Sequence, residues 1–261
     1  MEEFKYIYES IDVFFLIFCR IAGFIMILPI IEESKIPKMT IVSLCTALTI
    51  PVFFKTDLTI DYYQPTLIYY AIALFREILV GLILGFIIKV FFQVYPFIGM
   101  MWSTQGGLSM SMVMDPTAGT QSSTLGKVYN LGFGVYFLIS GGYHYLIKAV
   151  VNTFETIPLN GAIFTTTMAL GMVSTLTDYF IICVRLSAPI IAILIIVDCV
   201  LGILARTVPQ MNMFVIGIPL KMIIMFILLI TSSTVFRPYN DLIIDNMVNT
   251  FTNLIQGLIP S

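Results

Sequence analysis

The chain has 261 residues, of which 59% are hydrophobic and only 11% are charged. Soluble domains carry about 25% charged residues, so this sequence has less than half of the usual solvating charge. The mean hydropathy of +0.99 and the formal net charge of −2 exclude a protein that binds nucleic acid by neutralising phosphates. The composition predicts an all-α integral membrane protein that forms a single domain over residues 1–261.

Apolar segments long enough to span a bilayer follow one another along the chain, since spanning needs about 20 predominantly apolar residues. The sequence predicts about six such helices, over residues 11–31, 39–54, 67–95, 128–151, 179–204 and 212–236. The stretch 97–114 has no charge but is rich in Gly, Ser and Met, which favours a loop or broken helix at membrane depth. After Pro238, apolar residues at helical spacing predict a C-terminal amphipathic helix over 241–259.

Several charged residues lie inside these apolar segments: Arg20, Arg76, Glu77, Lys89, Arg185, Asp198 and Lys221. A charge at membrane depth costs roughly 2.5–3.5 kcal/mol on insertion scales, so each needs a partner or a wet cavity. Ion pairing between packed helices is favoured over a proton or ion path, because no carboxylates cluster on one face as a relay would need. Arg185 and Asp198 lie about 20 Å apart along one predicted helix, so their partners are expected on other helices or chains.

The sequence offers no set of residues for catalysis, a cofactor or a metal ion. His144 is the only histidine, and one histidine cannot build a zinc site. The four cysteines lie singly in apolar runs and are interpreted as small core residues: Cys19, Cys45, Cys183 and Cys199. Patterns typical of hydrolases, P-loops and metalloproteases are absent from the sequence. We therefore expect neither an enzyme nor a resident cofactor or metal.

Two pairs of glycines predict close approach between helices. Gly81 and Gly85 form a GxxxG pattern. Gly132 and Gly134 mark a second helix face where small residues permit close packing.

The segment 106–116 is the most unusual part of the chain. Adjacent Gly106 and Gly107 permit sharp turns, and Asp115 followed by Pro116 favours a turn. Between them lie Met110, Met112 and Met114. Flexible methionine side chains suit a loop that closes around a passing chain. An ordinary core loop filled with methionine explains the same residues equally well, so the residues alone leave both interpretations open.

Pro209 predicts where the last two long helices separate. It removes a backbone donor and disfavours helix at Val208. We therefore expect a hairpin tip over residues 206–210, where Arg206 donates to open carbonyls at the helix end or to an acidic neighbour.

Four stretches carry a resemblance to a known family, in the expected order and over nearly the whole chain: 20–38, 107–116, 152–158 and 201–221. The last, LGILARTVPQMNMFVIGIPLK, is the most specific. Together they resemble the FliR family, the SctT class of type III export-gate proteins. The third stretch departs from the family's DTFxxLP pattern, with Asn152 in place of Asp.

The resemblance implies a non-enzymatic pore and gate subunit of the flagellar export apparatus, through which unfolded flagellar proteins pass. It implies a single copy whose helices pack as tilted hairpins against FliP and FliQ, with FlhB around the gate and FlhA beneath it. The expected location is the bacterial inner membrane at the flagellar basal body, in contact with lipid and not with nucleic acid. Some relatives carry FlhB fused to their C-terminus, and because this chain ends at Ser261 we expect FlhB to be separate.

The resemblance also assigns roles by position. The loop 106–116 corresponds to a plug in the channel, with pore-facing side chains at Met110 and Val113. The residues expected in the plug are Gly106, Gly107, Met110, Met112, Val113, Met114, Asp115 and Pro116. The residues expected to act in assembly are Arg20, Arg185, Asp198, Arg206, Pro209, Gln210 and Phe214.

Three alternatives to this function remain. The first is an export-gate subunit of an injectisome, of the SctT type. The amino-acid sequence of residues 210–221 favours the flagellar branch over this alternative. The second is a secondary transporter of ions or small solutes, which predicts an inverted repeat that the sequence does not contain. The third is a membrane-bound enzyme, which needs a clustered catalytic set.

Overall fold

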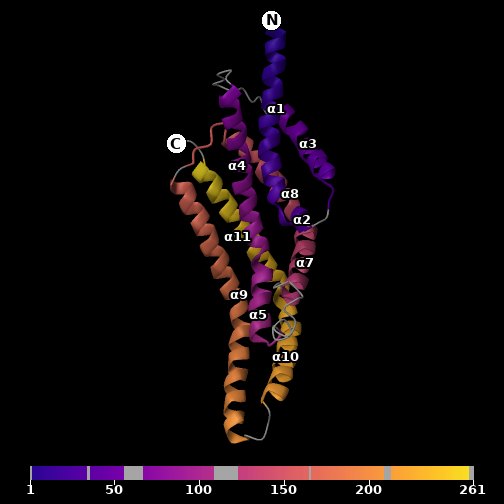
Figure 1. The fold of residues 1–261 in the computed structure, drawn as a ribbon, viewed down its shortest axis with the longest axis vertical. Coiled ribbons are helices and arrows are strands. Elements are labelled where there is room, and N and C mark those ends of the chain that lie inside the picture. The colour runs from indigo at the N-terminus through magenta and orange to yellow at the C-terminus, as the bar shows by residue number, and fades with distance from the viewer. Residues whose placement is uncertain are drawn as a thin grey trace. The chain divides into compact units, whose positions relative to one another are not determined.

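The computed structural model describes residues 2–33, 36–55, 67–108, 123–164, 166–208 and 213–258, and within them helices joined by turns are the only regular structure, with no strand (Figure 1). The all-α class predicted from composition is therefore confirmed for the described residues. The chain divides into two compact units. The first comprises Met1–Phe91, Gly141–Leu176 and Asn246–Ser261, and the second comprises Phe92–Ser140 and Thr177–Asp245.

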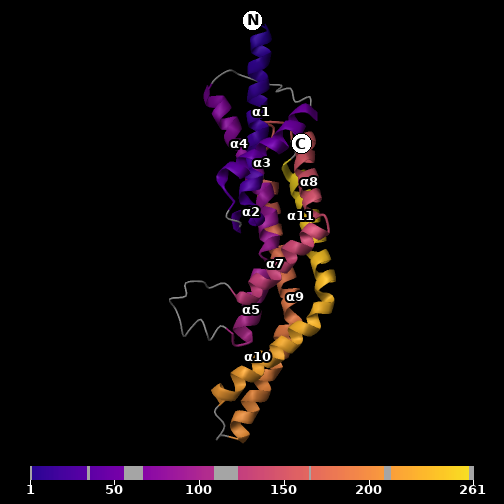
Figure 2. The same cartoon turned by 90° about the vertical axis from the view of Figure 1, so that its right-hand side faces the viewer.

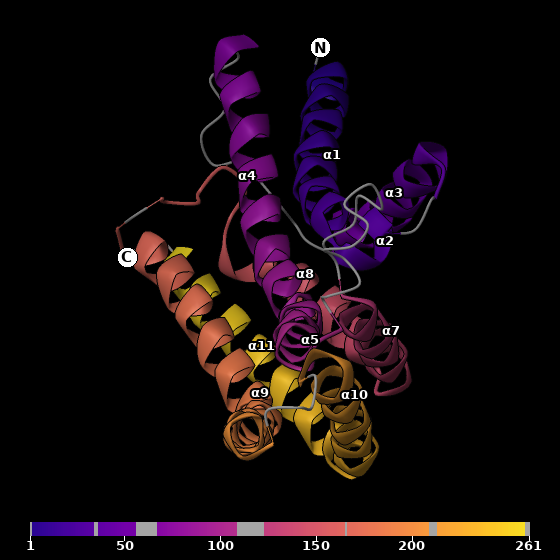
Figure 3. The ribbon, with the colours of Figure 1, turned by 60° about the horizontal axis from the view of Figure 1, so that its bottom comes forward.

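The first unit contains four complete helices and parts of three others: α1 (Glu2–Ile27), α2 (Pro29–Glu33), α3 (Lys38–Lys55), most of α4 (Leu67–Phe92), α8 (Gly142–Thr156), the start of α9 (Thr166–Thr207) and the end of α11 (Phe236–Leu258). Helix α3 packs on α1, where the rings of Phe14 and Phe53 meet edge to face with centroids 5.9 Å apart. Figure 3 shows α1 also running beside α4.

Glycines allow α1 and α4 to approach this closely. A Cβ atom on Gly81 would overlap the carbonyl oxygen of Arg20, and one on Gly85 would overlap the Ile27 side chain. On the facing helix, a Cβ on Gly23 would lie 2.6 Å from the carbonyl oxygen of Ile78. The close packing predicted from the GxxxG pattern is confirmed.

The second unit contains α5 (Val94–Gln105), α7 (Thr124–Ile139), most of α9, α10 (Met213–Ser232), the short 3-10 helix η2 (Ser233–Val235) and the start of α11. Figure 2 shows α5 and α7 together, and their contact is tight because Gly99 faces the backbone of Gly126. Helices α9 and α10 also lie side by side, with Gly217 against the Leu201 side chain. Aromatic rings of Tyr95, Trp102 and Tyr129 fill the space beside α5.

The single span predicted over 128–151 is wrong. The structure has two helices there, α7 ending at Ile139 and α8 beginning at Gly142. Between them Gly141 has φ 76, a left-handed conformation that glycine adopts without steric cost. The run of Ser140, Gly141 and Gly142 therefore ends one helix and starts another.

Three other predicted boundaries differ from the structure. Residues 97–105, part of the stretch 97–114 expected to be a loop or broken helix, lie in the regular helix α5 (Val94–Gln105). Pro96 is tolerated in its first turn, where backbone N–H groups have no helical partner. Helix α9 begins at Thr166 and runs for 42 residues, well beyond the predicted 179–204. Helix α11 begins at Phe236, so Pro238 again lies in a first turn and not before the helix.

Four helical segments in the described parts of the chain are long and apolar enough to cross a membrane: Lys38–Lys55, Ile68–Gln105, Thr166–Thr207 and Val215–Leu258. The count of six spans and their arrangement as tilted hairpins stay predictions, as does a single domain over 1–261. The amphipathic C-terminal helix is confirmed, since Ile243, Met247, Phe251 and Leu254 are buried along one face. The predicted break between the last long helices is also confirmed, because α9 ends at Thr207 and α10 begins at Met213.

Candidate functional site: the loop root and two ion pairs

The chain leaves α5 through two glycines that pack against α10. The backbone N–H of Gly106 donates to the carbonyl of Trp102 at 2.7 Å and closes the last turn of the helix. Gly107 follows with φ 82. A Cβ on Gly106 would overlap the sulfur of Met225, and one on Gly107 would touch Ile218 at 3.5 Å. The two glycines therefore fix where the central segment departs from the helix bundle of this unit.

The chain re-enters the same place at the start of α7. Ser123 is the N-cap of α7, and its hydroxyl accepts from the N–H of Gly126 at 3.3 Å. The same hydroxyl lies 2.5 Å from the hydroxyl of Ser103 on α5, and both serines are buried. We call residues 103–107 together with Ser123 the loop root, because they hold the two ends of the central segment side by side.

An ion pair beside the loop root joins α9 to α10. The ammonium nitrogen of Lys221 lies 2.5 Å from Oδ1 of Asp198, and the side chains are 16% and 42% exposed, respectively. The second oxygen, Oδ2, accepts from Nε2 of Gln105 at 2.9 Å. Three helices thus meet at one carboxylate, and the last residue of α5 is among its partners.

A second ion pair lies in the first unit and is fully buried. Nε of Arg20 on α1 lies 2.5 Å from Oε2 of Glu77 on α4, with both side chains 0% exposed. Nη1 of Arg20 donates to the carbonyl oxygens of Thr153 and Ile157, each at 3.1 Å. The guanidinium also stacks over the ring of Phe154 at 4.5 Å from its centroid. Arg20 therefore connects α1 to α4 and to the C-terminal end of α8.

The turn after α8 is held by the same carboxylate. Oε1 of Glu77 accepts from the backbone N–H of Asn160 at 2.7 Å, while the Asn160 side chain donates to the hydroxyl of Tyr69 at 2.7 Å. Asn160 has φ 60, and asparagine is among the few residues that adopt this conformation readily. Glu77 thus balances the charge of Arg20 and fixes a turn of unusual backbone geometry.

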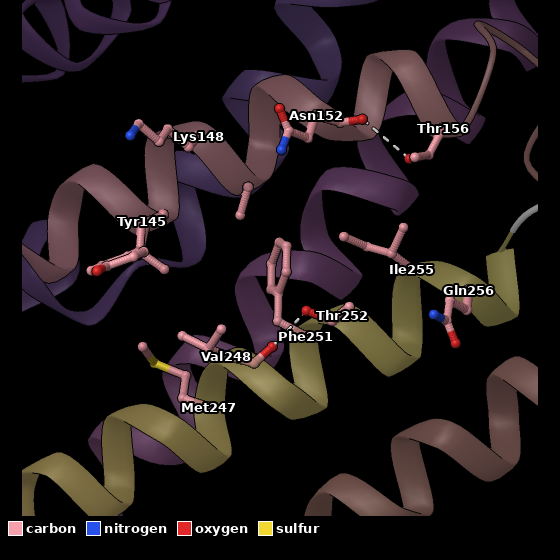
Figure 4. Close-up of a pocket in the computed structure, with 12 residues that line it drawn as sticks. Tyr145, Lys148, Asn152, Thr156, Met247, Val248, Phe251, Thr252, Ile255 and Gln256 are labelled. Atoms are coloured by element: carbon pink, nitrogen blue, oxygen red, sulfur yellow. Dashed lines mark hydrogen bonds between the residues drawn. The ribbon is translucent and has the colours of Figure 1, made fainter.

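A groove of about 520 Å³ runs between α8 and the end of α11 in the first unit (Figure 4). Phe251 and Ile255 point from α11 toward α8, and Leu146 and Ala149 complete an apolar lining. Asn152, the position that departs from the family pattern, lines the same groove.

The structure separates the residues predicted to act in assembly. Arg20 is buried in the first unit, whereas Asp198 sits beside the loop root in the second. Arg185 and Arg206 are exposed on α9, and within the described part of the chain Arg185 makes no ion pair. Pro209 and Gln210 lie outside the described residues, as does the side chain of Phe214.

Of the residues predicted to form the plug, only the two glycines are described. Gly106 and Gly107 stand in the loop root. The others lie outside the described residues: Met110, Met112, Val113, Met114, Asp115 and Pro116. Among the described residues, no three His, Cys, Asp or Glu side chains cluster as metal ligands would.

Sequence reasoning missed residues that the structure brings into these sites. Glu77 and Lys221 were marked as charges inside apolar segments that need partners, but neither was among the residues predicted to act in assembly. Gln105 had a weaker signal as the last polar residue before the two glycines. Ser103 and Ser123 carried no signal, because nothing in the sequence says that they meet across the central segment.

The described residues form apolar helices that are joined by charged side chains, and the two ends of the central segment lie beside one such junction. The chain belongs to the family described as bacterial export proteins, family 1, which matches residues 11–247. This match covers residues of both compact units.

Individual relatives agree with the family match. The chain is 30% identical to the flagellar biosynthetic protein FliR of Bacillus subtilis (strain 168), over 95% of this chain and 96% of the relative. It is 29% identical to the surface presentation of antigens protein SpaR of Shigella sonnei, over 88% and 90%. It is 25% identical to FliR of Escherichia coli (strain K12), over 95% and 94%. The resemblance to the FliR family is confirmed.

Proposed function

We propose that the chain is a non-enzymatic pore and gate subunit of a type III protein export apparatus in the bacterial cytoplasmic membrane. The family match over residues 11–247, together with relatives named for flagellar biosynthesis, carries this proposal. Helical segments apolar enough to cross a membrane are consistent with the location. The cargo is unfolded flagellar protein, and the site of action is the flagellar basal body.

The subunit works in an assembly with FliP-like and FliQ-like proteins, surrounded by an FlhB-like protein and with an FlhA-like protein beneath it. Large apolar side chains exposed along α9, among them Val184, Ile196 and Ile203, support contact with lipid or with neighbouring subunits. Purification from detergent with a tag on this chain tests the assembly. FliP-like and FliQ-like proteins are expected to copurify, and a long-lived monomer without them contradicts the proposal.

Arg206 is the assembly residue best placed for a test. It lies exposed in the last turn of α9, where a cation complements the partial negative charge of the helix end. Arg206→Ala should lower the recovery of the complex more than Lys127→Ala, which removes an exposed cation near the start of α7. Equal recovery of both variants removes the special role of Arg206.

The loop 106–116 acts as the plug of the pore, with Met110 and Val113 facing the lumen. The loop root supports this role, since two glycines and a pair of bonded serines place the ends of the segment side by side. Apolar, flexible side chains can exclude water when shut and yield to an unfolded chain.

Deleting residues 107–113, or substituting Met110→Gly and Val113→Gly, tests the plug. Because the loop is proposed to project from the bundle, assembly should remain largely intact while the membrane becomes permeable to small ions and dyes. Conductance at the wild-type level in a normally assembled complex would show that the loop is not the seal.

An injectisome export gate is the second candidate, favoured by the 29% identity to SpaR over 88% of the chain. Expression in two strains, one that lacks its flagellar gate subunit and one that lacks its injectisome gate subunit, distinguishes the two. Restored secretion of hook and filament proteins supports the flagellar function, and restored secretion of injectisome substrates alone supports the second.

A further inference from the structure

We propose that a pocket in the second unit binds the glycerol region of a phospholipid, with Trp102 as the hydrogen-bond donor to an ester carbonyl of the lipid. The pocket has a volume of about 280 Å³, and the described side chains that line it all belong to this unit. We call it the tryptophan pocket. This inference rests on the proposed membrane location of the chain and is independent of the pore and the plug.

Aromatic rings form one wall of the tryptophan pocket. The ring of Tyr129 meets those of Trp102 and Phe236 edge to face, with centroids 5.4 and 5.9 Å apart, and it stacks on Tyr95 at 5.9 Å. The hydroxyl of Tyr95 in turn donates to Oδ1 of Asn240 at 2.5 Å. These contacts hold the rings in place, so the wall is formed before a ligand enters.

The indole nitrogen of Trp102 is a buried donor without a partner. The residue is 4% exposed, and its Nε1 has no hydrogen-bond acceptor among the described residues. Native structures almost always supply an acceptor to such a group, because a buried donor left unpaired is costly. The hydroxyls of Thr231, Ser232 and Thr234, which also line the pocket, already donate to backbone carbonyls of earlier residues. The occupant is therefore expected to bring an acceptor to Trp102.

The second wall of the pocket is aliphatic. It is formed by Leu186, Pro189, Ile190 and Ile193 of α9 and by Leu228 of α10. A buried water needs about two to four polar partners, and cavities with aliphatic walls stay dry. A water at the indole nitrogen would therefore leave most of the pocket empty. A ligand that is mostly apolar and carries one acceptor fits both walls.

The pocket opens on helices that are apolar enough to cross a membrane. Helices α9 and α10 belong to the segments Thr166–Thr207 and Val215–Leu258, and Ile193 of the pocket is exposed. The apolar run of α10 ends at Ser232, and two more hydroxyl-bearing residues follow it, so the pocket lies where apolar side chains give way to polar ones. Tryptophan and tyrosine favour this interfacial level of a bilayer. The ester carbonyls of phospholipids lie at the same level, between the headgroups and the acyl chains.

The order of side chains along α9 indicates the direction of the lipid. Arg185 is exposed, makes no ion pair within the described part of the chain, and lies four residues before Pro189, on the same side of the helix. A lipid phosphate is the charge complement of this guanidinium. In the other direction, Ile196 and Val200 follow Ile193 at helical spacing and are also exposed. The phosphate is therefore expected toward Arg185 and the acyl chain along these aliphatic residues.

The test uses the full chain in detergent, together with any subunits that copurify. Ester-linked and ether-linked phosphatidylglycerol with chains of the same length are added in equal amounts, and native mass spectrometry measures how much of each lipid is retained. Because the ether lipid lacks the carbonyl, the loss of one hydrogen bond should favour the ester lipid about fivefold. Trp102→Phe keeps an aromatic ring and removes the donor, so the two lipids should then be retained equally. A purely structural role of Trp102 would not change this ratio.

Two further variants keep Trp102 in place. Ile193→Phe narrows the pocket and should lower the retention of both lipids. Ile230→Phe is its matched control, because it makes the same change at an exposed position of α10 that does not line the pocket. Arg185→Gln should lower the retention of both lipids by up to about fivefold and leave their ratio unchanged, since the phosphate is common to both.

Several results would overturn the lipid site. These are no retained lipid, equal retention of the two lipids by the wild type, and an ester preference that survives Trp102→Phe. Equal losses in Ile193→Phe and Ile230→Phe would also overturn it, because the lipid would then coat the surface at large. If the chain alone selects the ester lipid but the chain with its copurified subunits does not, a neighbouring subunit fills the pocket in the assembly and the lipid is not its occupant.

The same preparation shows whether the lipid site or the proposed function fails. Copurification of FliP-like and FliQ-like proteins without any lipid selectivity overturns the site and leaves the proposed function standing. Selection of the ester lipid by a long-lived monomer that copurifies with neither protein supports the site and contradicts the proposed function.

Discussion

Two ion pairs in the described part of the chain, Arg20–Glu77 and Asp198–Lys221, differ in nearly every physical respect. Arg20 and Glu77 in the first unit are 0% exposed. Asp198 and Lys221 in the second unit are 42% and 16% exposed. The first pair has further hydrogen bonds to backbone groups on α8 and the turn after it. The second has one further partner, the amide of Gln105.

The choice of cation matches this difference. The guanidinium of Arg20 is a planar fork whose Nε and Nη1 serve a carboxylate and two carbonyls at once, while its buried Nη2 has no hydrogen-bond partner among the described residues. The ammonium of Lys221 is a compact charge on a flexible stem, and it tolerates rearrangement of its surroundings. We infer that the first pair sets the fold of its unit, whereas the second pair can rearrange without a large loss of stability.

The largest expected effect comes from breaking the buried pair on one side. Glu77→Gln keeps the shape and can still accept from Asn160, but it leaves the charge of Arg20 uncompensated. Removing one partner of a buried pair typically costs about 3–5 kcal/mol, so the complex should unfold at a much lower temperature or fail to form. Thermal unfolding in detergent, followed by circular dichroism at 222 nm, measures this.

Glu155→Gln is the matched control, because Glu155 is paired with Lys55 at 3.0 Å on the surface of the same unit. Joint substitution of Arg20→Met and Glu77→Leu should cost less than the sum of the single changes. If Glu77→Gln and Glu155→Gln shift the unfolding temperature equally, the buried pair does not set the fold of its unit.

The next effect concerns the helix contact that carries Arg20. A methyl group at Gly81 would overlap the carbonyl oxygen of Arg20, and backbone atoms cannot rotate away, so Gly81→Ala should destabilise by about 1–3 kcal/mol. Gly134 on α7 has no atom within 4 Å of such a methyl group. Gly134→Ala should be neutral or stabilising by up to about 1 kcal/mol, since alanine favours helix. The same unfolding measurement compares them, and equal shifts would contradict the close contact.

The sequence supported local conclusions about this chain better than it supported distant ones. Apolar runs located α3 and α10 to within a few residues, and Pro209 located the break after α9. The rule that buried charges need partners was sufficient to predict pairing between helices. Each of these conclusions depends only on the residues of one segment and on the free energy of placing those residues in lipid or in water.

The partners themselves could not be predicted. Arg20 and Glu77 are 57 positions apart, and Gln105 and Asp198 are 93 apart, so only the packing of helices brings them together. The helix break at Gly141 was missed because two glycines in an apolar stretch do not by themselves indicate a left-handed turn. The extra turns of α9 before Tyr179 mix Thr, Ser and Gly with apolar residues, a composition that obscures a helix in the sequence.

In the second unit, Lys221→Met removes a cation whose partner is partly solvated. The Asp198 carboxylate keeps its bond to Gln105 and can recruit water, so the free energy of unfolding should fall by only about 1 kcal/mol. Thermal unfolding of the complex again provides the measurement. A loss as large as that of Glu77→Gln would show that both pairs are structural and would remove the contrast between the units.

The smallest effect is expected for Lys55→Met on the surface of the first unit. Lys55 and Glu155 are 60% and 53% exposed, so water screens their attraction and both side chains lose freedom when they pair. Exposed pairs contribute about 0.2–1 kcal/mol, and salt weakens them further. The unfolding temperature of the variant should therefore lie within a degree or two of the wild type at low salt, roughly the shift expected for so small an energy in a chain of this size. At about 0.5 M NaCl the two should coincide, because the Debye length there is shorter than the reach of most surface interactions. A clear difference that persists in salt would mean that Lys55 also holds the end of α3 through its stem, and that exposure alone does not rank the ion pairs of this chain.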